Sequence, residues 1–124
     1  MLNHISIGSR DIERARTFYD AVMKPLGYKR LADAQDGIGY GKDAGAFWVS
    51  LVKRPVKADP DNGLHICFDA PTRASVDAFY KAALAAGGAD NGKPGVRENY
   101  GPRYYAAFVV DPDGYRIEAY CGKP

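Results

Sequence analysis

The stretch Leu-Asn-His-Ile-Ser-Ile at residues 2–7 indicates the architecture of the chain, because a later stretch repeats its pattern. Residues 63–68 read Gly-Leu-His-Ile-Cys-Phe, and the chain's two histidines, His4 and His65, hold the same place in these stretches. The shift that superimposes them also superimposes other similar residues: Phe18 on Phe79, Tyr19 on Tyr80 and Gly27 on Gly88. Such self-similarity indicates one supersecondary unit that is present twice.

The first unit is predicted to contain a strand, a helix and three further strands. Residues 2–8 alternate between the two faces of a strand. Asp11 is a candidate N-cap for an amphipathic helix over about residues 12–24. Three strands are then expected at about 28–33, 37–42 and 46–53, separated by turn residues such as Asp36-Gly37.

The second unit repeats this order with one difference. A strand is expected at 63–70, followed by a helix that Thr72 caps. Residues 89–102 are rich in glycine and proline, so we expect the next strand to be weak or replaced by a long loop. The final strands are expected at 103–110 and 115–121, joined by a tight Asp-Pro-Asp-Gly turn.

These elements predict a single α+β domain built from two βαβββ modules. With 124 residues, the chain fits one domain with a substantial core. The first module covers about residues 1–54, a linker with two prolines covers 55–62, and the second module covers 63–121.

Composition excludes several classes of function. The net charge is only +2, and no Lys/Arg run is interleaved with aromatic residues, so we expect no nucleic-acid partner. Neither a membrane-spanning stretch nor a signal peptide is evident, which favours the cytoplasm. Cys67 and Cys121 are expected on opposite faces of their strands, so no disulfide should form, as in a reducing compartment.

Strand alternation also predicts a polar sheet face opposite the core. The residues expected on that face are His4, Ser6, Ser50, His65, Cys67, Arg116, Glu118 and Tyr120. Imidazole, carboxylate and guanidinium groups are costly in a dry core. We therefore expect them to line a polar cavity, in which His4, His65 and Glu118 are candidate ligands for a metal ion. The alternative is two structural histidines and a surface carboxylate.

The closing run Asp-Pro-Asp-Gly-Tyr-Arg-Ile-Glu at residues 111–118 resembles the signature of the vicinal oxygen chelate superfamily. That superfamily includes glyoxalase I, extradiol dioxygenases, fosfomycin-resistance thiol transferases and bleomycin-binding proteins. The resemblance covers the whole chain and implies a curved mixed sheet of two βαβββ modules around a metal-binding cavity. It also implies one divalent ion, of Fe, Mn, Ni, Co or Zn, bound by His4, His65 and Glu118.

The fourth strand departs from the pattern of glyoxalase I, which places a glutamate there. The matching residue is Ser50, or Val49 if the alignment shifts by one position, and neither is such a ligand. The serine-rich phosphonate-binding loop of the fosfomycin group is also missing. The resemblance therefore implies a metal-dependent lyase, thiol transferase or dioxygenase that acts on a small metal-chelating oxygenated substrate. The competing class is a metal-free protein that sequesters an antibiotic.

Several residues are candidates for contact with the substrate. Glu118 and Tyr120 are the candidate catalytic residues, and the candidates for the base are Tyr120, Tyr104 and a metal-bound hydroxide. The candidate substrate-binding residues are Ser6, Trp48, Ser50, Arg97, Arg103 and Tyr104. For the arginines the alternative is a solvated surface side chain, and for Trp48 and Tyr120 it is core packing. The resemblance also implies a homodimer, and the sequence leaves open whether the metal site lies within one chain or across two.

Overall fold

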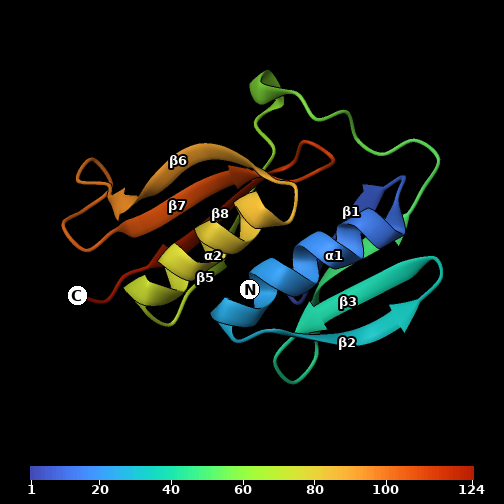
Figure 1. Cartoon of the computed structure of the whole chain (residues 1–124), viewed down its shortest axis with the longest axis horizontal. Coiled ribbons are helices and arrows are strands. Elements are labelled where there is room, and N and C mark those ends of the chain that lie inside the picture. Colours follow the sequence, from blue (N-terminus) through green and yellow to red (C-terminus); the bar gives the residue numbers. More distant parts are fainter.

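The computed structural model describes all 124 residues and contains two βαβββ modules side by side (Figure 1). The first module consists of β1 (Ile5–Ser9), α1 (Ile12–Met23), β2 (Lys29–Ala34), β3 (Gly37–Gly41) and β4 (Gly45–Leu51). The second consists of β5 (His65–Asp69), α2 (Arg73–Ala85), β6 (Ala89–Val96), β7 (Tyr105–Val110) and β8 (Arg116–Cys121). Two 3-10 helices, Lys24–Leu26 and Pro60–Asn62, complete the structure, the second in the connection between the modules.

Each module forms its own four-stranded mixed sheet with the same topology. The strand orders are β1-β4-β3-β2 and β5-β8-β7-β6. In each sheet the first strand pairs in parallel with the last, and the remaining pairs are antiparallel. This shared order confirms the predicted repeat. It also leaves β1 and β5 as edge strands, each with one side of its backbone unpaired.

The two helices lie together between the sheets and share one hydrophobic core. α1 contacts β2, β3 and β4, α2 contacts β6, β7 and β8, and the helices contact each other. The buried residues of each helix recur at helical spacing: Ala15, Phe18, Tyr19 and Val22 in α1, and Val76, Phe79 and Ala83 in α2. Two other residues at the same spacing in α2 are less buried, because Tyr80 is half-buried and Leu84 is 42% exposed. Neither helix has the length and apolar character needed to cross a bilayer.

The helix start at Thr72 provides a direct test of local stability. Its hydroxyl accepts a hydrogen bond of 3.0 Å from the backbone N–H of Ser75. Thr72→Ala should therefore lower the free energy of unfolding by about 1 kcal/mol, the usual value of an N-cap. Thr17→Ala is the matched control, because Thr17 lies inside α1 and Ala is the better helix former there. Urea unfolding of both variants checks the difference, and equal destabilisation would contradict it.

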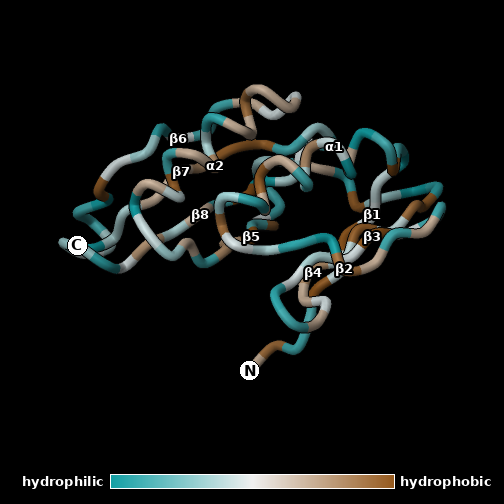
Figure 2. The backbone as a smooth tube through the Cα atoms, turned by 60° about the horizontal axis from the view of Figure 1, so that its bottom comes forward, coloured by the Kyte–Doolittle hydropathy of each residue, from teal (hydrophilic) through white to brown (hydrophobic).

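The first strand begins later than its sequence predicts. β1 starts at Ile5, which pairs with Phe47, and residues 2–4 have no partner in the β1–β4 ladder. Figure 2 shows the N-terminal end leaving the body of the molecule. His4 is therefore exposed and lies outside the strand on which it was expected.

The glycine- and proline-rich segment forms a strand where a weak strand or a long loop was expected. β6 pairs with β7 through two register irregularities, one on each side of Gly92. Gly92 has φ +148°, a backbone conformation that L side chains rarely adopt. Pro94 is tolerated because β6 is an edge strand, so a missing N–H breaks no central ladder.

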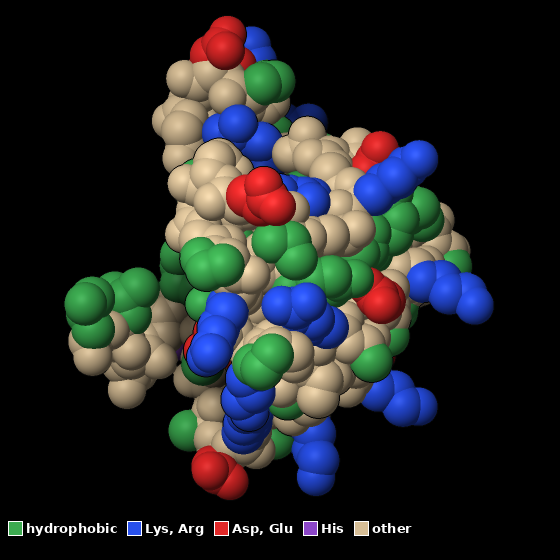
Figure 3. All heavy atoms as spheres, turned by 90° about the vertical axis from the view of Figure 1, so that its left-hand side faces the viewer, with side chains coloured by type: hydrophobic (Ala, Val, Ile, Leu, Met, Phe, Trp, Pro, Cys, Tyr) green, Lys and Arg blue, Asp and Glu red, His purple; other side chains and the backbone are tan.

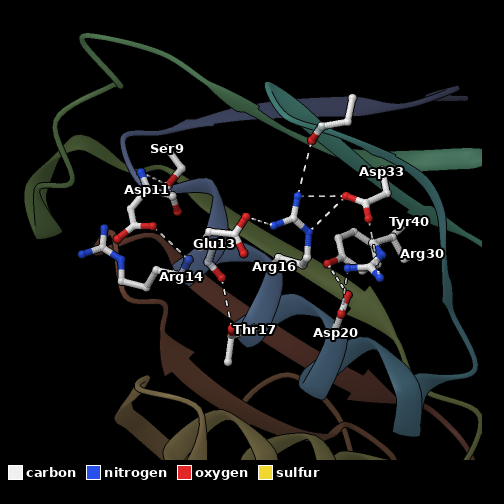
Figure 4. A network of polar contacts seen from close by, with 11 residues as sticks. Ser9, Asp11, Glu13, Arg14, Arg16, Thr17, Asp20, Arg30, Asp33 and Tyr40 are labelled. Carbon is white, nitrogen blue, oxygen red and sulfur yellow. Dashed lines mark hydrogen bonds and ion pairs between the residues drawn. The ribbon is translucent and has the colours of Figure 1, made fainter.

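An ion-pair network ties the edge strand β2 to α1 (Figure 4). Arg16 pairs with Glu13 in its own helix and with Asp33 in β2, at 2.5 and 2.8 Å. Arg30 in β2 pairs in turn with Asp20 in α1, at 3.0 Å. Asp20 also accepts a hydrogen bond of 2.7 Å from the hydroxyl of the buried Tyr40. These contacts hold a strand whose own side chains are mostly exposed.

The Asp-Pro-Asp-Gly turn between β7 and β8 joins the second module to the first. Asp111 is buried, and its Oδ2 accepts a hydrogen bond of 2.5 Å from the hydroxyl of Tyr19 in α1. Its Oδ1 accepts from the backbone N–H groups of Asp113 and Tyr115, both at 2.9 Å. Burial outweighs these bonds and raises the pKa of Asp111 to about 6.

The rest of this turn contacts the end of β1. Ser9 donates its hydroxyl to Asp113 at 2.8 Å, and Arg14 forms an ion pair with the same carboxylate. The hydroxyl of Tyr115 donates to the carbonyl oxygen of Gly8 at 2.7 Å. The motif that resembles the superfamily signature is thus the main polar connection between the modules.

Candidate functional site

A buried carboxylate forms the centre of the candidate site. Glu118 is only 4% exposed and lies in the middle of β8. Its Oε1 is 2.7 Å from Nε2 of His65, and its Oε2 accepts a hydrogen bond of 2.6 Å from the hydroxyl of Tyr104. The two oxygens of one acid are therefore held by two side chains that lie on different elements.

Strand register explains why His65 reaches Glu118. The parallel pairing of β5 with β8 places Cys67 directly opposite Glu118, and His65 is two residues before Cys67 on the same face. Ile117 and Ala119, which flank Glu118, are fully buried on the opposite face, as their alternation predicted. The predicted polar face of the second module is thus present.

The loop between β6 and β7 delivers Tyr104 to the carboxylate. The backbone N–H of Arg97 donates to the carbonyl oxygen of Tyr104 at 2.7 Å. The backbone N–H of Tyr104 donates in turn to the carbonyl oxygen of Gly101 at 3.2 Å. The Tyr104 ring packs against Tyr120, with ring centroids 4.3 Å apart, and against Tyr100 at 5.1 Å. Tyr104 is therefore fixed in two ways: its backbone is hydrogen-bonded within the loop, and its ring is packed between neighbouring aromatic rings.

Phe108 forms the other wall of this centre, a role that no sequence motif predicted. It lies opposite Glu118 in the β7–β8 pairing, and its ring centroid is 5.8 Å from that of His65. The guanidinium of Arg97 lies 5.2 Å from the centroid of the same ring. The only sequence signal for Phe108 was its parity in β7, and that signal is weak because nearly every residue of this strand is apolar.

Two groups beside Glu118 keep their protons at neutral pH. Burial, and then the hydrogen bond to Glu118, raises the pKa of Tyr104. Partial burial of its thiol, and then the charge of Glu118, raises the pKa of Cys67 to about 12. Tyr104 is therefore a hydrogen-bond donor here, and Cys67 is a neutral thiol. Cys67 and Cys121 are both free thiols, the first exposed and the second buried.

His4 lies apart from the other two candidate ligands. It is on the exposed N-terminal segment, where its Nδ1 is 2.7 Å from Oδ1 of Asn3. His4 and His65 do line one cavity of about 530 Å³ between the modules, whose other walls include Tyr28, Phe47 and Phe68. No three His, Cys, Asp or Glu side chains of the chain are grouped so as to hold a metal ion.

The set of side chains that could hold a metal ion is therefore incomplete in a single chain. The imidazole of His65 and the carboxylate of Glu118 meet at 2.7 Å and form a donor pair that suits first-row divalent metals. The third expected ligand, His4, is not grouped with them in a single chain. Two of the three expected ligands are thus together and the third is missing.

The candidate substrate residues of the first module lie away from this centre. Ser6 and Trp48 are register partners in the β1–β4 pairing, and Ser50 is two residues further along β4. None of them hydrogen-bonds to the Glu118 centre. The Trp48 ring lies over Gly39, where an added Cβ would be 2.5 Å from it. Val49 is 1% exposed in the core, so Ser50 and not Val49 occupies the polar face.

The remaining candidates belong to the second module. Arg97 donates to the Lys93 carbonyl oxygen at 2.5 Å, and Arg103 is exposed. Tyr120 is half-buried and lines a second pocket of about 380 Å³, together with Lys42, Lys123 and Asp69. Figure 3 views the end of the molecule where the C-terminus emerges and shows more basic than acidic side chains there. This pocket offers positive charge beside the aromatic wall of the site.

Comparison with known proteins identifies the class that this fold and site define. The family model of the Glyoxalase/Bleomycin resistance protein/Dioxygenase superfamily matches residues 1–119, and the chain belongs to this superfamily. A glyoxalase/bleomycin resistance protein from Albidiferax ferrireducens T118 is similar in structure, with a TM-score of 0.85 and 31% identity over 97% of this chain and 98% of that one.

Two further relatives show how far the similarity extends. The uncharacterized protein YqjT of Bacillus subtilis (strain 168) is 28% identical over 127 residues, covering 94% of this chain and 95% of its own. The fosfomycin resistance protein FosX from Mesorhizobium loti superimposes with a TM-score of 0.69 at 16% identity, over 99% of this chain and 92% of that one. At that level of identity the FosX match shows the fold alone.

Proposed function

We propose that the protein is a divalent-metal-dependent enzyme that acts on a small oxygenated substrate and works as a homodimer. In this proposal His65 and Glu118 of one chain, together with His4 of a second copy, hold the ion. The observation that carries it is the 2.7 Å contact between His65 and the buried Glu118. A buried carboxylate needs a partner that compensates its charge, and a metal ion is one such partner.

Two further observations support a second copy. The N-terminal segment that carries His4 is exposed, and it includes two exposed apolar residues, Met1 and Leu2. The edge strands β1 and β5 each have an unpaired side, and the cavity that His4 and His65 share opens between the modules. A symmetric partner would cover these features and bring a second His4 to the site.

Other residues of the chain orient the metal ligand, exclude water and transfer a proton. When bound, the ion would supply a Lewis acid that polarises an oxygen of the substrate. Tyr104 keeps Glu118 in one orientation, and Phe108 and Tyr120 limit the access of water to it. We assign proton transfer to Tyr120, because it is half-buried and lines the second pocket beside the site. The free thiols suit the reducing cytoplasm that the sequence predicts.

Metal titration of the chelator-treated protein tests this proposal. The wild type should bind about one Mn, Fe, Co, Ni or Zn ion per chain, and loss of a ligand in His65→Ala or Glu118→Gln should weaken binding by roughly 100-fold or more. Glu98→Gln is the matched control, because Glu98 is an exposed carboxylate of the nearby loop. A wild type that binds no ion, or ligand variants that bind like the control, would refute the proposal.

The reaction class requires a separate screen. The metal-loaded protein should be offered hemithioacetals, epoxides with a thiol or water as nucleophile, and catechols with oxygen, which represent the isomerase and lyase, thiol-transfer and dioxygenase chemistries of the superfamily. Glu118→Gln provides the background rate for each substrate. Turnover of one class that depends on both the ion and Glu118 would assign the reaction.

A metal-free binding protein is the second candidate. The cavity of about 530 Å³ is lined mainly by hydrophobic residues, including Tyr28, Phe47 and Phe68, which suits a flat organic ligand. Binding of such a ligand after metal removal, with the same affinity in His65→Ala, would favour this alternative. Binding that requires the ion would favour the enzyme.

A further inference from the structure

We propose that Tyr104 is a positioning residue that restricts Glu118 to a single metal-binding oxygen. This inference rests on the function proposed above and adds to it how many oxygens of the Glu118 carboxylate bind the ion. The hydroxyl of Tyr104 donates to Oε2 at 2.6 Å, while Oε1 faces Nε2 of His65 at 2.7 Å. The two oxygens of Glu118 therefore face different partners, and only Oε1 faces the other ligand.

The geometry around Tyr104 keeps this arrangement in place. Glu118 is 4% exposed, so water cannot readily take the place of the tyrosine hydroxyl on Oε2. The Tyr104 ring is packed against Tyr120 at 4.3 Å, and its carbonyl oxygen is bonded to the N–H of Arg97. Rotation of the carboxylate toward a two-oxygen arrangement would break a hydrogen bond to a charged acceptor, which is among the stronger types.

Apart from Tyr104 and His65, the nearest donor to the Glu118 carboxylate is the thiol of Cys67. Cys67 lies opposite Glu118 in the β5–β8 pairing, but a thiol is a weak donor. Phe108, on the other side of Glu118, has no polar group at all. Removal of the Tyr104 hydroxyl therefore leaves a buried oxygen without a good partner, and we expect that oxygen to turn toward a bound ion.

The consequence concerns both affinity and metal choice. Groups that orient a metal ligand typically account for 10- to 100-fold in metal affinity. A carboxylate limited to one oxygen, beside an imidazole, suits the smaller ions with nitrogen preference such as Zn²⁺. A carboxylate free to offer both oxygens suits larger, oxygen-preferring ions such as Mn²⁺. Tyr104 should thus raise the preference for Zn²⁺ over Mn²⁺.

Tyr104→Phe and Tyr105→Phe form a matched pair for the test. Phe keeps the ring that packs on Tyr120 and removes only the hydroxyl. Tyr105 also donates its hydroxyl to a carboxylate at 2.6 Å, but that carboxylate is the exposed Asp77 of α2. Zn²⁺ and Mn²⁺ titrations of wild type and both variants measure the dissociation constants. Near-UV circular dichroism checks the fold, and the Co²⁺ absorption spectrum gives a second readout of the coordination number.

In Tyr104→Phe, Zn²⁺ affinity should fall by about 10- to 100-fold and Mn²⁺ affinity by less, so the ratio of the two constants changes. The Co²⁺ bands should also weaken, as they do at higher coordination number. Tyr105→Phe should match the wild type in all three measurements. If the wild type binds ions and Tyr104→Phe keeps its affinities, ratio and spectrum, this inference alone is overturned. If the wild type binds no ion, the proposed function fails, and this inference with it.

Discussion

About a quarter of the wild-type metal sites should appear when His4→Ala and His65→Ala chains, each unable to bind on its own, are refolded together in equal amounts. Under the proposed function, a site combines His4 of one chain with His65 and Glu118 of the other. Half of the randomly formed dimers are mixed, and one of the two sites in each mixed dimer is intact. A site within one chain would recover nothing.

The control for this experiment uses two variants from the same module. His65→Ala mixed with Glu118→Gln should recover no site, because His65 and Glu118 are 2.7 Å apart in the same chain. Metal content after gel filtration measures both mixtures. Recovery in the control, or none in the test mixture when the wild type binds fully, would contradict a site shared in this way. The latter result would mean that the N-terminal segment brings His4 to His65 within one chain.

The contribution of Asp111 to the stability of the protein should rise as the pH falls from 8 to 5. The pKa of this buried carboxyl is raised to about 6 in the folded protein, above its ordinary value of 3.8. The folded state therefore binds the proton more readily than the unfolded state. The stability that this gives is complete below the unfolded pKa and is lost as pH rises through 6. A shift of this size corresponds to at most roughly 3 kcal/mol.

Asp111→Asn isolates this contribution, because its amide cannot titrate. Urea unfolding at several pH values between 5 and 8 should show the wild type gaining stability relative to the variant as pH falls. Asp113→Asn is the matched control, since Asp113 lies in the same turn and is paired with Arg14. A constant difference between wild type and Asp111→Asn across this range would contradict the prediction.

Local patterns predicted the helices and the faces of the strands well. The N-caps Asp11 and Thr72 both accept the expected backbone hydrogen bonds. Those features depend on neighbours in sequence, so the sequence alone determines them. The extent of β6 and the first residue of β1 differ from the prediction, because both depend on pairing with another strand. β6 pairs with β7 although β6 contains two glycines, while residues 2–4 have no partner on β4.

In the candidate site, too, the features set by strand alternation were predictable and those set by tertiary contacts were not. The meeting of His65 with Glu118 follows from parity and the repeat, both of which are visible in the sequence. The hydrogen bond from Tyr104 to Glu118 depends on how the loop at residues 97–104 closes, and no periodic pattern encodes that closure. The separation of His4 from the other two depends on where β1 begins. Sequence therefore identified the candidate ligands but not their grouping.

The unpaired sides of β1 and β5 have a consequence for how this protein behaves at different concentrations. If a second copy completes the site, dilution below the dissociation constant of the pair separates the ligands as well as the subunits. Turnover per chain would then fall on dilution, while the two modules of each chain stay folded around their common core. The abundance of the chain in its cell would thereby set the fraction of it that is active.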